Sequence, residues 1–232
     1  MLTVRKSQER GQANHGWLNS YHSFSFANYF DPNFMGFGTL RVINEDIIQA
    51  KMGFPTHSHQ NMEIITYVIE GALEHKDSMG NSSVIRPGEV QRMSAGTGVS
   101  HSEYNHSDRE SVHLLQIWIL PEKKGLPASY EQKMYSAAEK RGQLRLVGSR
   151  DGRDGSVTIH QDVDLYASLL APGEKIEYDI KGDRQIWLQI VSGDLIVNDR
   201  QVYTGDAVAI ADETNLVLVA QTNTEFLLFN LG

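Results

Sequence analysis

The sequence predicts an all-β protein whose two halves form similar antiparallel barrels or sandwiches in tandem. Short runs rich in β-branched and aromatic residues alternate with turn signals such as Pro87-Gly88 and Pro172-Gly173, and helical periodicity is almost absent. The second half also repeats the first, because residues 186–195 resemble residues 64–73. A length of 232 residues is sufficient for two domains that each bury a core.

Composition limits the function classes that fit this chain. Lys and Arg number 21 against 29 Asp and Glu, a net charge of −8, so we expect no direct binding of nucleic acid. There are no cysteines, which excludes disulfides, thiolate nucleophiles and iron–sulfur clusters and leaves any metal to His and carboxylate ligands. No apolar run approaches the length of a membrane span, so we expect a cytoplasmic protein that does not bind membranes.

Residues 1–121 are interpreted as the first domain. Residues 39–50 predict a strand, a turn at Asn44-Glu45-Asp46 and a second strand. A strand carrying a His-x-His pair follows, and residues 63–70 predict another strand that ends at Gly71. Residues 112–120 close the domain with a strongly apolar strand.

Residues 122–145 are interpreted as a linker and residues 146–232 as the second domain. Ser129 to Arg141 predicts a short helix with Ser129 as its N-cap and Gly142 as its stop. When the two halves are aligned on their shared pattern, Asp179 and Lys181 fall opposite the two histidines of the His-x-His pair. The second domain therefore lacks the ligands, and we expect one metal site per chain.

Two pairs of potential metal ligands dominate the first domain. His57 and His59 are two residues apart, and so are His101 and Glu103. Residues two apart on a strand point to the same face, so facing strands would bring three imidazoles and a carboxylate to one point. Nitrogen and oxygen donors suit Fe, Mn, Co, Ni, Cu or Zn. A closed structural zinc site is the alternative to an ion with open positions for substrate.

The same segments carry a family resemblance. His57, His59 and Glu63 fit the first conserved motif of the cupins, and His101 and Asn105 fit parts of the second. Residues 93–98 and the triplet His101-Ser102-Glu103 resemble the pirin family of bicupins more closely. The resemblance implies two tandem jelly-roll barrels of the cupin type. It also implies that His57, His59, His101 and Glu103 hold one divalent transition metal per chain, and we favour Fe(II).

The resemblance further implies an activity similar to quercetin 2,3-dioxygenase, which opens flavonols with O2 and releases carbon monoxide. Glu103 would then be the catalytic base that accepts the proton of the flavonol 3-hydroxyl, and the partners would be an aromatic small molecule and O2. The alternative is a metal- or redox-sensing protein that binds and modulates a protein partner. A cupin isomerase, which consumes no O2, is a third hypothesis.

Several residues near the motifs receive other roles. We expect Glu63 to orient a metal ligand without binding the ion itself, and the alternative is an unrelated carboxylate at the end of a strand. By their spacing, His75, His106 and His113 do not share the ligand face, and we interpret them, with His15, His22 and His160, as surface or hydrogen-bonded polar residues. The apolar residues that could line the mouth of the site, or pack in the core, are Phe24, Phe26, Phe54 and Met62.

Overall fold

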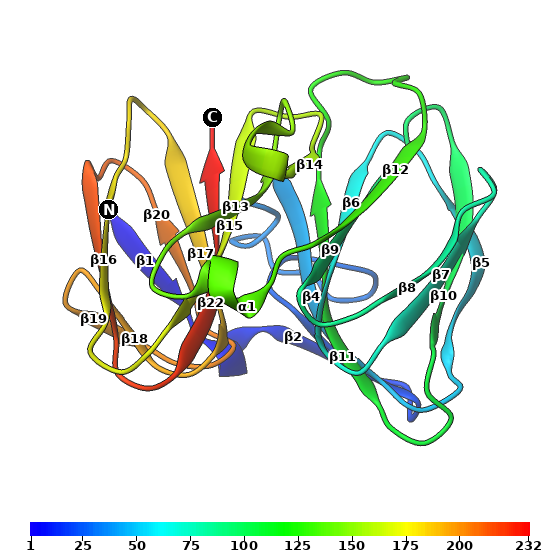
Figure 1. Cartoon of the computed structure of the whole chain (residues 1–232), viewed down its shortest axis with the longest axis horizontal. Helices are drawn as coiled ribbons and strands as arrows, with labels where there is room; N and C mark the ends of the chain where they lie inside the picture. Colours follow the sequence, from blue (N-terminus) through cyan, green and yellow to red (C-terminus); the bar gives the residue numbers. More distant parts are fainter. The chain divides into compact units, whose positions relative to one another are not determined.

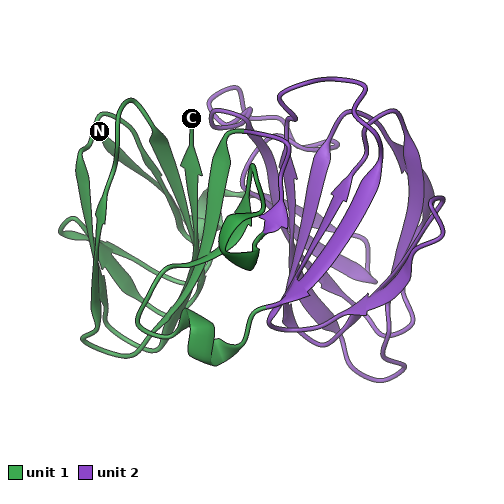
Figure 2. Ribbon diagram, turned by 45° about the horizontal axis from the view of Figure 1, so that its top comes forward, with its two compact units in different colours: residues 1–10, 135–156, 162–232 green, residues 11–134, 157–161 purple.

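The runs of β-branched and aromatic residues form strands, and the all-β class predicted from the sequence is confirmed (Figure 1). The computed structural model describes residues 1–232. Its strands divide between two units (Figure 2). Unit 1 contains residues 1–10, 135–156 and 162–232, and unit 2 contains residues 11–134 and 157–161. None of the helices is long and apolar enough to cross a membrane.

Unit 2 consists mainly of two antiparallel sheets. The larger has the strand order β12-β9-β6-β11-β4-β3-β2, and the smaller has the order β5-β10-β7-β8. The strands are β2 (Gly11–Asn14), β3 (Leu18–His22), β4 (Leu40–Ile48), β5 (Gly53–His59), β6 (Glu63–Glu70), β7 (Leu73–Asp77), β8 (Ser82–Ile85), β9 (Glu89–Ser94), β10 (Val99–Asn105), β11 (Val112–Ile119) and β12 (Ser129–Met134). A short strand, β14 (Val157–Thr158), lies beside β9 and β12.

The interior of unit 2 has a polar layer between two apolar clusters. Side chains alternate across each strand, so every second residue faces the interior. The inner face of β6 carries Ile64, Thr66 and Val68, and that of β11 carries Trp118, Gln116 and Leu114. Ile64 and Trp118 belong to one apolar cluster, and Val68 and Leu114 belong to the other. The polar residue between them is buried and must find hydrogen bonds inside the barrel.

Unit 1 also has two antiparallel sheets. Their strand orders are β1-β20-β17-β22-β15-β13 and β16-β21-β18-β19. The elements are β1 (Leu2–Arg5), η1 (Ser7–Glu9), α1 (Ala137–Lys140), β13 (Arg145–Ser149), η2 (Arg153–Gly155), β15 (Val163–Leu170), β16 (Lys175–Asp179), β17 (Gln185–Ser192), β18 (Leu195–Val197), β19 (Arg200–Val202), β20 (Ala207–Ile210), β21 (Asn215–Ala220) and β22 (Thr224–Leu231). Ile, Leu, Val, Ala and Phe side chains fill its core cluster. Asp179 and Lys181 are exposed at the end of β16.

Two segments group differently from the ranges expected from the sequence. Strand β1 pairs with β20 and so belongs with the C-terminal unit. The buried carboxylate of Asp206 holds the start of the chain there, because it accepts hydrogen bonds from the Ser7 amide (2.7 Å) and from Lys6 Nζ (3.1 Å). Residues 157–161 group with unit 2, because their backbone and side chains bond to that barrel.

The structure corrects two predictions of secondary structure. The predicted turn at residues 44–46 is wrong, since β4 is continuous and hydrogen-bonded to β11 and β3 on its two sides. The predicted helix is also too long: Ser129 begins strand β12, which pairs with β9. Helix α1 spans only Ala137–Lys140, and Ser136 is its N-cap in a capping box with Glu139. In both places sheet pairing overrides local turn or helix propensity.

Candidate metal and substrate site

Three of the predicted ligands come together across a strand pair. Strands β5 and β10 are antiparallel partners, and His101 lies directly opposite His57. The ring centroids of His57 and His101 are 4.4 Å apart, and that of His59 lies 4.8 and 4.9 Å from them. The Nε2 atoms of His57 and His101 are 3.0 Å apart. The three imidazoles therefore lie together, as the spacing within each pair of residues predicted.

Hydrogen bonds fix which nitrogen of His57 is bare. Its Nδ1 lies 2.9 Å from the carbonyl oxygen of Pro55. A carbonyl oxygen only accepts, so Nδ1 carries the proton and Nε2 of the neutral ring keeps its lone pair. The Nε2 lone pair points toward the other two histidines.

A second set of polar contacts surrounds His101. His75 Nε2 lies 3.2 Å from the carboxylate of Asp77, which accepts the single proton of neutral His75. His75 Nδ1 is then an acceptor, and two nitrogens lie near it: Gln91 Nε2 at 3.4 Å and His101 Nδ1 at 3.5 Å. On the other side of the His101 ring, Nε2 lies within hydrogen-bonding distance of the bare Nε2 of His57. A cation bound by both Nε2 atoms would take the place of the proton between them.

Burial keeps the rings of His59, His75 and His101 neutral. It lowers the pKa of His101 to about 3 and that of His59 to about 4, and repulsion from neighbouring imidazolium charge adds to the effect. Burial also lowers the pKa of His75. Neutral imidazoles at neutral pH are the form that binds a metal. The donor set therefore fits a divalent transition metal.

Glu103 lies deeper than the histidines. A register shift between His101 and Glu103 places Glu103 opposite Phe54 on β5 and opposite His75 on β7. Its two carboxyl oxygens accept from the amide nitrogen of Gln116 at 3.1 and 3.0 Å, and burial raises the pKa of Glu103 to about 7. The potential ligand atoms form two overlapping groups that share His101: one with His57 and His59, the other with His75 and Glu103. The assignment of four metal ligands stays a prediction.

A cavity of about 540 Å³ opens beside these residues in unit 2. His57, His59 and Glu103 contribute to its wall. The remaining lining is largely apolar and includes the aromatic side chains of Trp17, Phe26, Phe54 and Trp118. Of the residues expected at an apolar mouth, Phe26 and Phe54 line the cavity, whereas Phe24 and Met62 pack against other core residues.

The cavity also has a polar wall on the larger sheet. Strands β3 and β4 contribute the side chains of Ser20, His22, Asn44 and Asp46. His22 Nδ1 is 2.8 Å from the side-chain oxygen of Asn44 and 3.4 Å from Ser20 Oγ. Burial raises the pKa of Asp46 to about 6, while a hydrogen bond from Ser20 opposes that rise. Sequence reasoning missed this wall because it assigned Asn44 and Asp46 to a turn.

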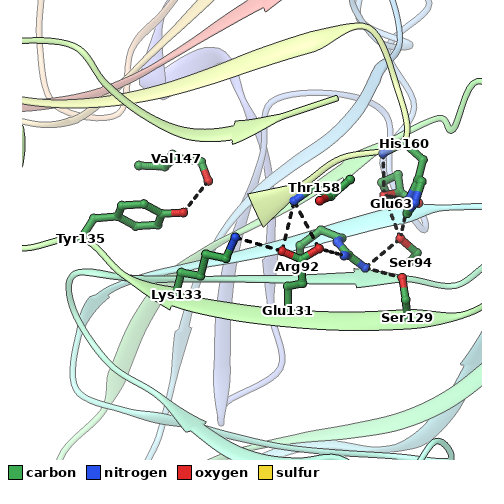
Figure 3. A network of polar contacts seen from close by, with 10 residues as sticks. All are labelled: Glu63, Arg92, Ser94, Ser129, Glu131, Lys133, Tyr135, Val147, Thr158 and His160. Carbon is green, nitrogen blue, oxygen red and sulfur yellow. Dashed lines mark hydrogen bonds and ion pairs between the residues drawn. The ribbon is translucent and has the colours of Figure 1, made fainter. Parts of the chain in front are cut away.

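The prediction that Glu63 orients a metal ligand is wrong, because its hydrogen bonds go to Ser94 and His160 and not to His57, His59 or His101. Glu63 is buried and accepts hydrogen bonds from Ser94 Oγ (2.9 Å), from the His160 amide (3.1 Å) and from His160 Nδ1 (3.1 Å), as Figure 3 shows. It holds residues 157–161 against β6 and β9. Arg92 continues the network through Ser94, Ser129 and Glu131.

The group of Ser94, His160 and Glu63 is not a nucleophilic triad. Ser94 Oγ and the Glu63 carboxylate approach the same nitrogen of His160, Nδ1, at 3.0 and 3.1 Å. A catalytic His needs one nitrogen for the nucleophile and the other for the carboxylate. The group therefore has a structural role.

Sequence reasoning also missed His75. It lies on the interior face, opposite Glu103 in the β10–β7 pairing, and contacts His101. The pair His75 and Asp77 has the same spacing of two residues as the recognised ligand pairs, and that spacing was the available signal. His106 and His113 do lie away from the site, within hydrogen-bonding distance of Glu74 (3.4 Å) and Glu45 (2.9 Å).

Comparison with known proteins agrees with the resemblance seen in the motifs. Residues 3–119 match a family model described as Pirin, and residues 146–231 match one described as Quercetinase C-terminal cupin domain. The chain is 51% identical over 231 residues to the quercetin 2,3-dioxygenase of Escherichia coli (strain K12), covering 100% of this chain and 99% of that protein. It is 37% identical to a pirin-like protein of Caulobacter vibrioides, with 98% of each chain covered.

Solved structures agree as well. The crystal structure of the bacterial pirin YhhW from Escherichia coli in complex with nickel(II) superposes with a TM-score of 0.96 at 50% identity, covering 100% of this chain and 99% of that chain. A second crystal structure of YhhW from Escherichia coli superposes with a TM-score of 0.97 at 51% identity, covering 100% of this chain and 98% of that chain. Two cupin-type barrels, as predicted, are confirmed.

We expect Glu63→Ala to loosen residues 157–161 without disturbing the histidines. The substitution leaves the Ser94 hydroxyl and the His160 amide without their buried acceptor, which costs about 1–3 kcal/mol. Hydrogen exchange should show faster exchange in residues 157–161 and unchanged protection in β5 and β10. Glu70→Ala, at the exposed end of the same strand, is the control. Equal protection of residues 157–161 in both variants would contradict the tether.

We expect Asp46→Asn to stabilise the protein increasingly as the pH rises. A pKa raised from 3.8 to about 6 by folding means that the stability contributed by protonated Asp46 is complete below pH 3.8 and is lost as the pH rises through about 6. The loss amounts to about 3 kcal/mol, and Asn escapes it because it does not ionise.

The measurement is the free energy of unfolding in urea between pH 4 and 8. The difference between Asp46→Asn and the unsubstituted protein should grow in favour of the variant up to about pH 6 and stay level above it. Asp183→Asn, the same substitution at an exposed position, serves as the control. A constant difference for Asp46→Asn would show that Asp46 has no raised pKa.

Proposed function

The chain belongs to the pirin family of cupin proteins, and on that premise we propose that it is a metal-dependent dioxygenase that opens flavonols such as quercetin with O2 and releases carbon monoxide. One observation carries the proposal: a cluster of three imidazoles and a buried carboxyl lie beside a cavity with aromatic walls. A cavity of about 540 Å³ is within the ordinary range for a small-molecule site. The relative named quercetin 2,3-dioxygenase, 51% identical, adds support.

The proposed metal ligands are His57, His59, His101 and Glu103. Their nitrogen and oxygen donors suit a first-row divalent ion, and we favour Fe(II); the nickel(II) complex of YhhW supports a divalent ion at this fold. When bound, the ion would lower the pKa of a coordinated hydroxyl and stabilise negative charge. His75 and Gln116 would position His101 and Glu103 through the hydrogen bonds described above.

Glu103 is the proposed catalytic base. A flavonol must lose its 3-hydroxyl proton before it reacts with O2, and Glu103 is the buried carboxyl in the cavity wall that is placed to accept it. Gln116 Nε2 donates to both carboxyl oxygens, and Gln116 Oε1 accepts from Thr66 at 3.3 Å, so the carboxyl has a fixed orientation. The residue can then accept the proton without a change of rotamer.

The aromatic residues would hold a flat ring system. Phe54 packs edge-on against Trp17 with centroids 5.4 Å apart, and Phe26 packs edge-on against Trp118 at 5.5 Å. Within each pair, packing against one ring fixes the orientation of the other, so these parts of the cavity wall are preformed. Trp118 also lies 5.0 Å from His59, which connects the apolar wall to the histidine cluster.

Metal content and O2 uptake test the proposal directly. The unsubstituted protein should contain close to one metal ion per chain and consume O2 when quercetin is added. The double variant His57→Ala/His101→Ala should lose both, because two of the three imidazoles are gone. His113→Ala, an outward-facing histidine on β11, should keep both.

The outcomes separate the candidate functions. Metal without O2 uptake would reject the dioxygenase and favour the metal-sensing protein that binds a partner. Absence of metal in the unsubstituted protein, after reconstitution with Fe(II) or Ni(II), would reject both.

Glu103→Gln tests the base. Removal of a general base typically lowers the rate by about 10²–10⁴-fold, so kcat for quercetin should fall by about that factor. Metal content, measured on the same samples, should remain near that of the unsubstituted protein because the three imidazoles are unchanged. Glu110→Gln, in the exposed loop after β10, should not change kcat. Unchanged turnover in a Glu103→Gln variant that holds its metal would exclude the base role.

A further inference from the structure

Asp46 is a buried carboxylate with an unused hydrogen-bonding position beside the cavity. Its side chain belongs to the inner face of β4, and the residue is 4% exposed. Its Oδ1 atom is buried and has no hydrogen-bond partner, although the residue lines the cavity. A buried polar atom without a partner is destabilising, and in a native protein it indicates a role.

The neighbouring protein groups do not supply the missing donor. Ser20 already donates to the Asp46 carboxyl and also approaches His22. His22 Nδ1 is engaged with Asn44 at 2.8 Å. Gln116, on the adjacent strand, uses its amide nitrogen on Glu103 and its oxygen on Thr66. The unpartnered oxygen of Asp46 is therefore available to a molecule in the cavity.

The position of Asp46 separates it from the histidine cluster. His57 and His59 lie on β5 of the smaller sheet, whereas Asp46 lies on β4 of the larger sheet. Both sheets contribute to the cavity wall, and aromatic side chains line it as well. A flat molecule that meets the histidines with one polar group can thus present another polar group to Asp46.

The chemistry of Asp46 defines which group fits. Its unpartnered Oδ1 accepts a hydrogen bond, and the carboxylate form has no proton to donate. A phenolic hydroxyl satisfies it, whereas a carbonyl, a carboxylate or an apolar edge does not. Sites that hydrogen-bond a substrate hydroxyl discriminate strongly against the analogue that lacks it.

We propose that Asp46 is a specificity-determining residue that accepts a hydrogen bond from a second hydroxyl of the bound phenolic ligand. The protein therefore prefers polyhydroxylated flavonols to those that carry only the 3-hydroxyl. This inference rests on the proposed function, since it assumes that the 3-hydroxyl meets the metal ligands. The inference adds a requirement for a second hydroxyl on the flavonol, which the metal ligands alone do not impose.

The test compares the dissociation constants of quercetin and 3-hydroxyflavone under anaerobic conditions on metal-loaded protein. 3-Hydroxyflavone keeps the 3-hydroxyl and lacks the other four. The unsubstituted protein should prefer quercetin, and Asp46→Ala and Asp46→Asn should each reduce that preference by about tenfold, chiefly by weakening quercetin. Glu45→Gln, the neighbouring residue on the opposite face of β4, is the matched control and should keep the preference.

Each outcome decides the inference. An equal preference in both Asp46 variants and the unsubstituted protein would overturn it, as would failure of the unsubstituted protein to bind either flavonol. Because binding is measured without O2, the result is independent of turnover. An Asp46-dependent preference without O2 uptake would support the hydroxyl site and reject the dioxygenase. O2 uptake with an unchanged preference would support the dioxygenase and reject the role of Asp46.

Discussion

The position of β10 between β5 and β7 is the constraint on which the site depends. Pairing with β5 places His101 opposite His57, and pairing with β7 brings His75 and Asp77 to its other side. One strand thus holds the central imidazole between its neighbours on both edges. The backbone hydrogen bonds between these strands set the distances between the rings, so the imidazoles are positioned before an ion binds.

The polar layer of unit 2 has an energetic consequence. Thr66, Gln116, Glu103 and His75 are buried between two apolar clusters, where each polar group needs a partner. Most of these side chains find a hydrogen-bond partner within the layer. Oδ1 of Asp46, which lines the same cavity as Glu103, has no partner. Unit 1 also buries polar side chains, Ser168 and Gln189 among them, but both groups of potential metal ligands lie in unit 2. The polar layer of unit 2 therefore contains the candidate site, at some expense of stability.

Local sequence signals gave wrong predictions at two strands of unit 2, β4 and β12. Asn44 and Asp46 have high turn propensity, yet β4 is hydrogen-bonded on both edges and keeps them in an extended conformation. The segment that begins at Ser129 has helical propensity, but its pairing with β9 and the ion pair between Arg92 and Glu131 hold it in a strand. Such long-range pairings leave no local pattern that sequence reasoning can detect.

By itself the sequence determined the all-β class, the absence of cysteine ligands and the two pairs of candidate metal ligands, because alternation along a strand is a local property. Only the tertiary structure decided which residues contact those pairs. Glu63 is close in sequence to His57 and His59 but contacts His160. His75 contacts His101, and Gln116 donates a hydrogen bond to Glu103. Their roles depend on which strands become neighbours, and that choice rests on hydrogen bonds and packing between distant segments.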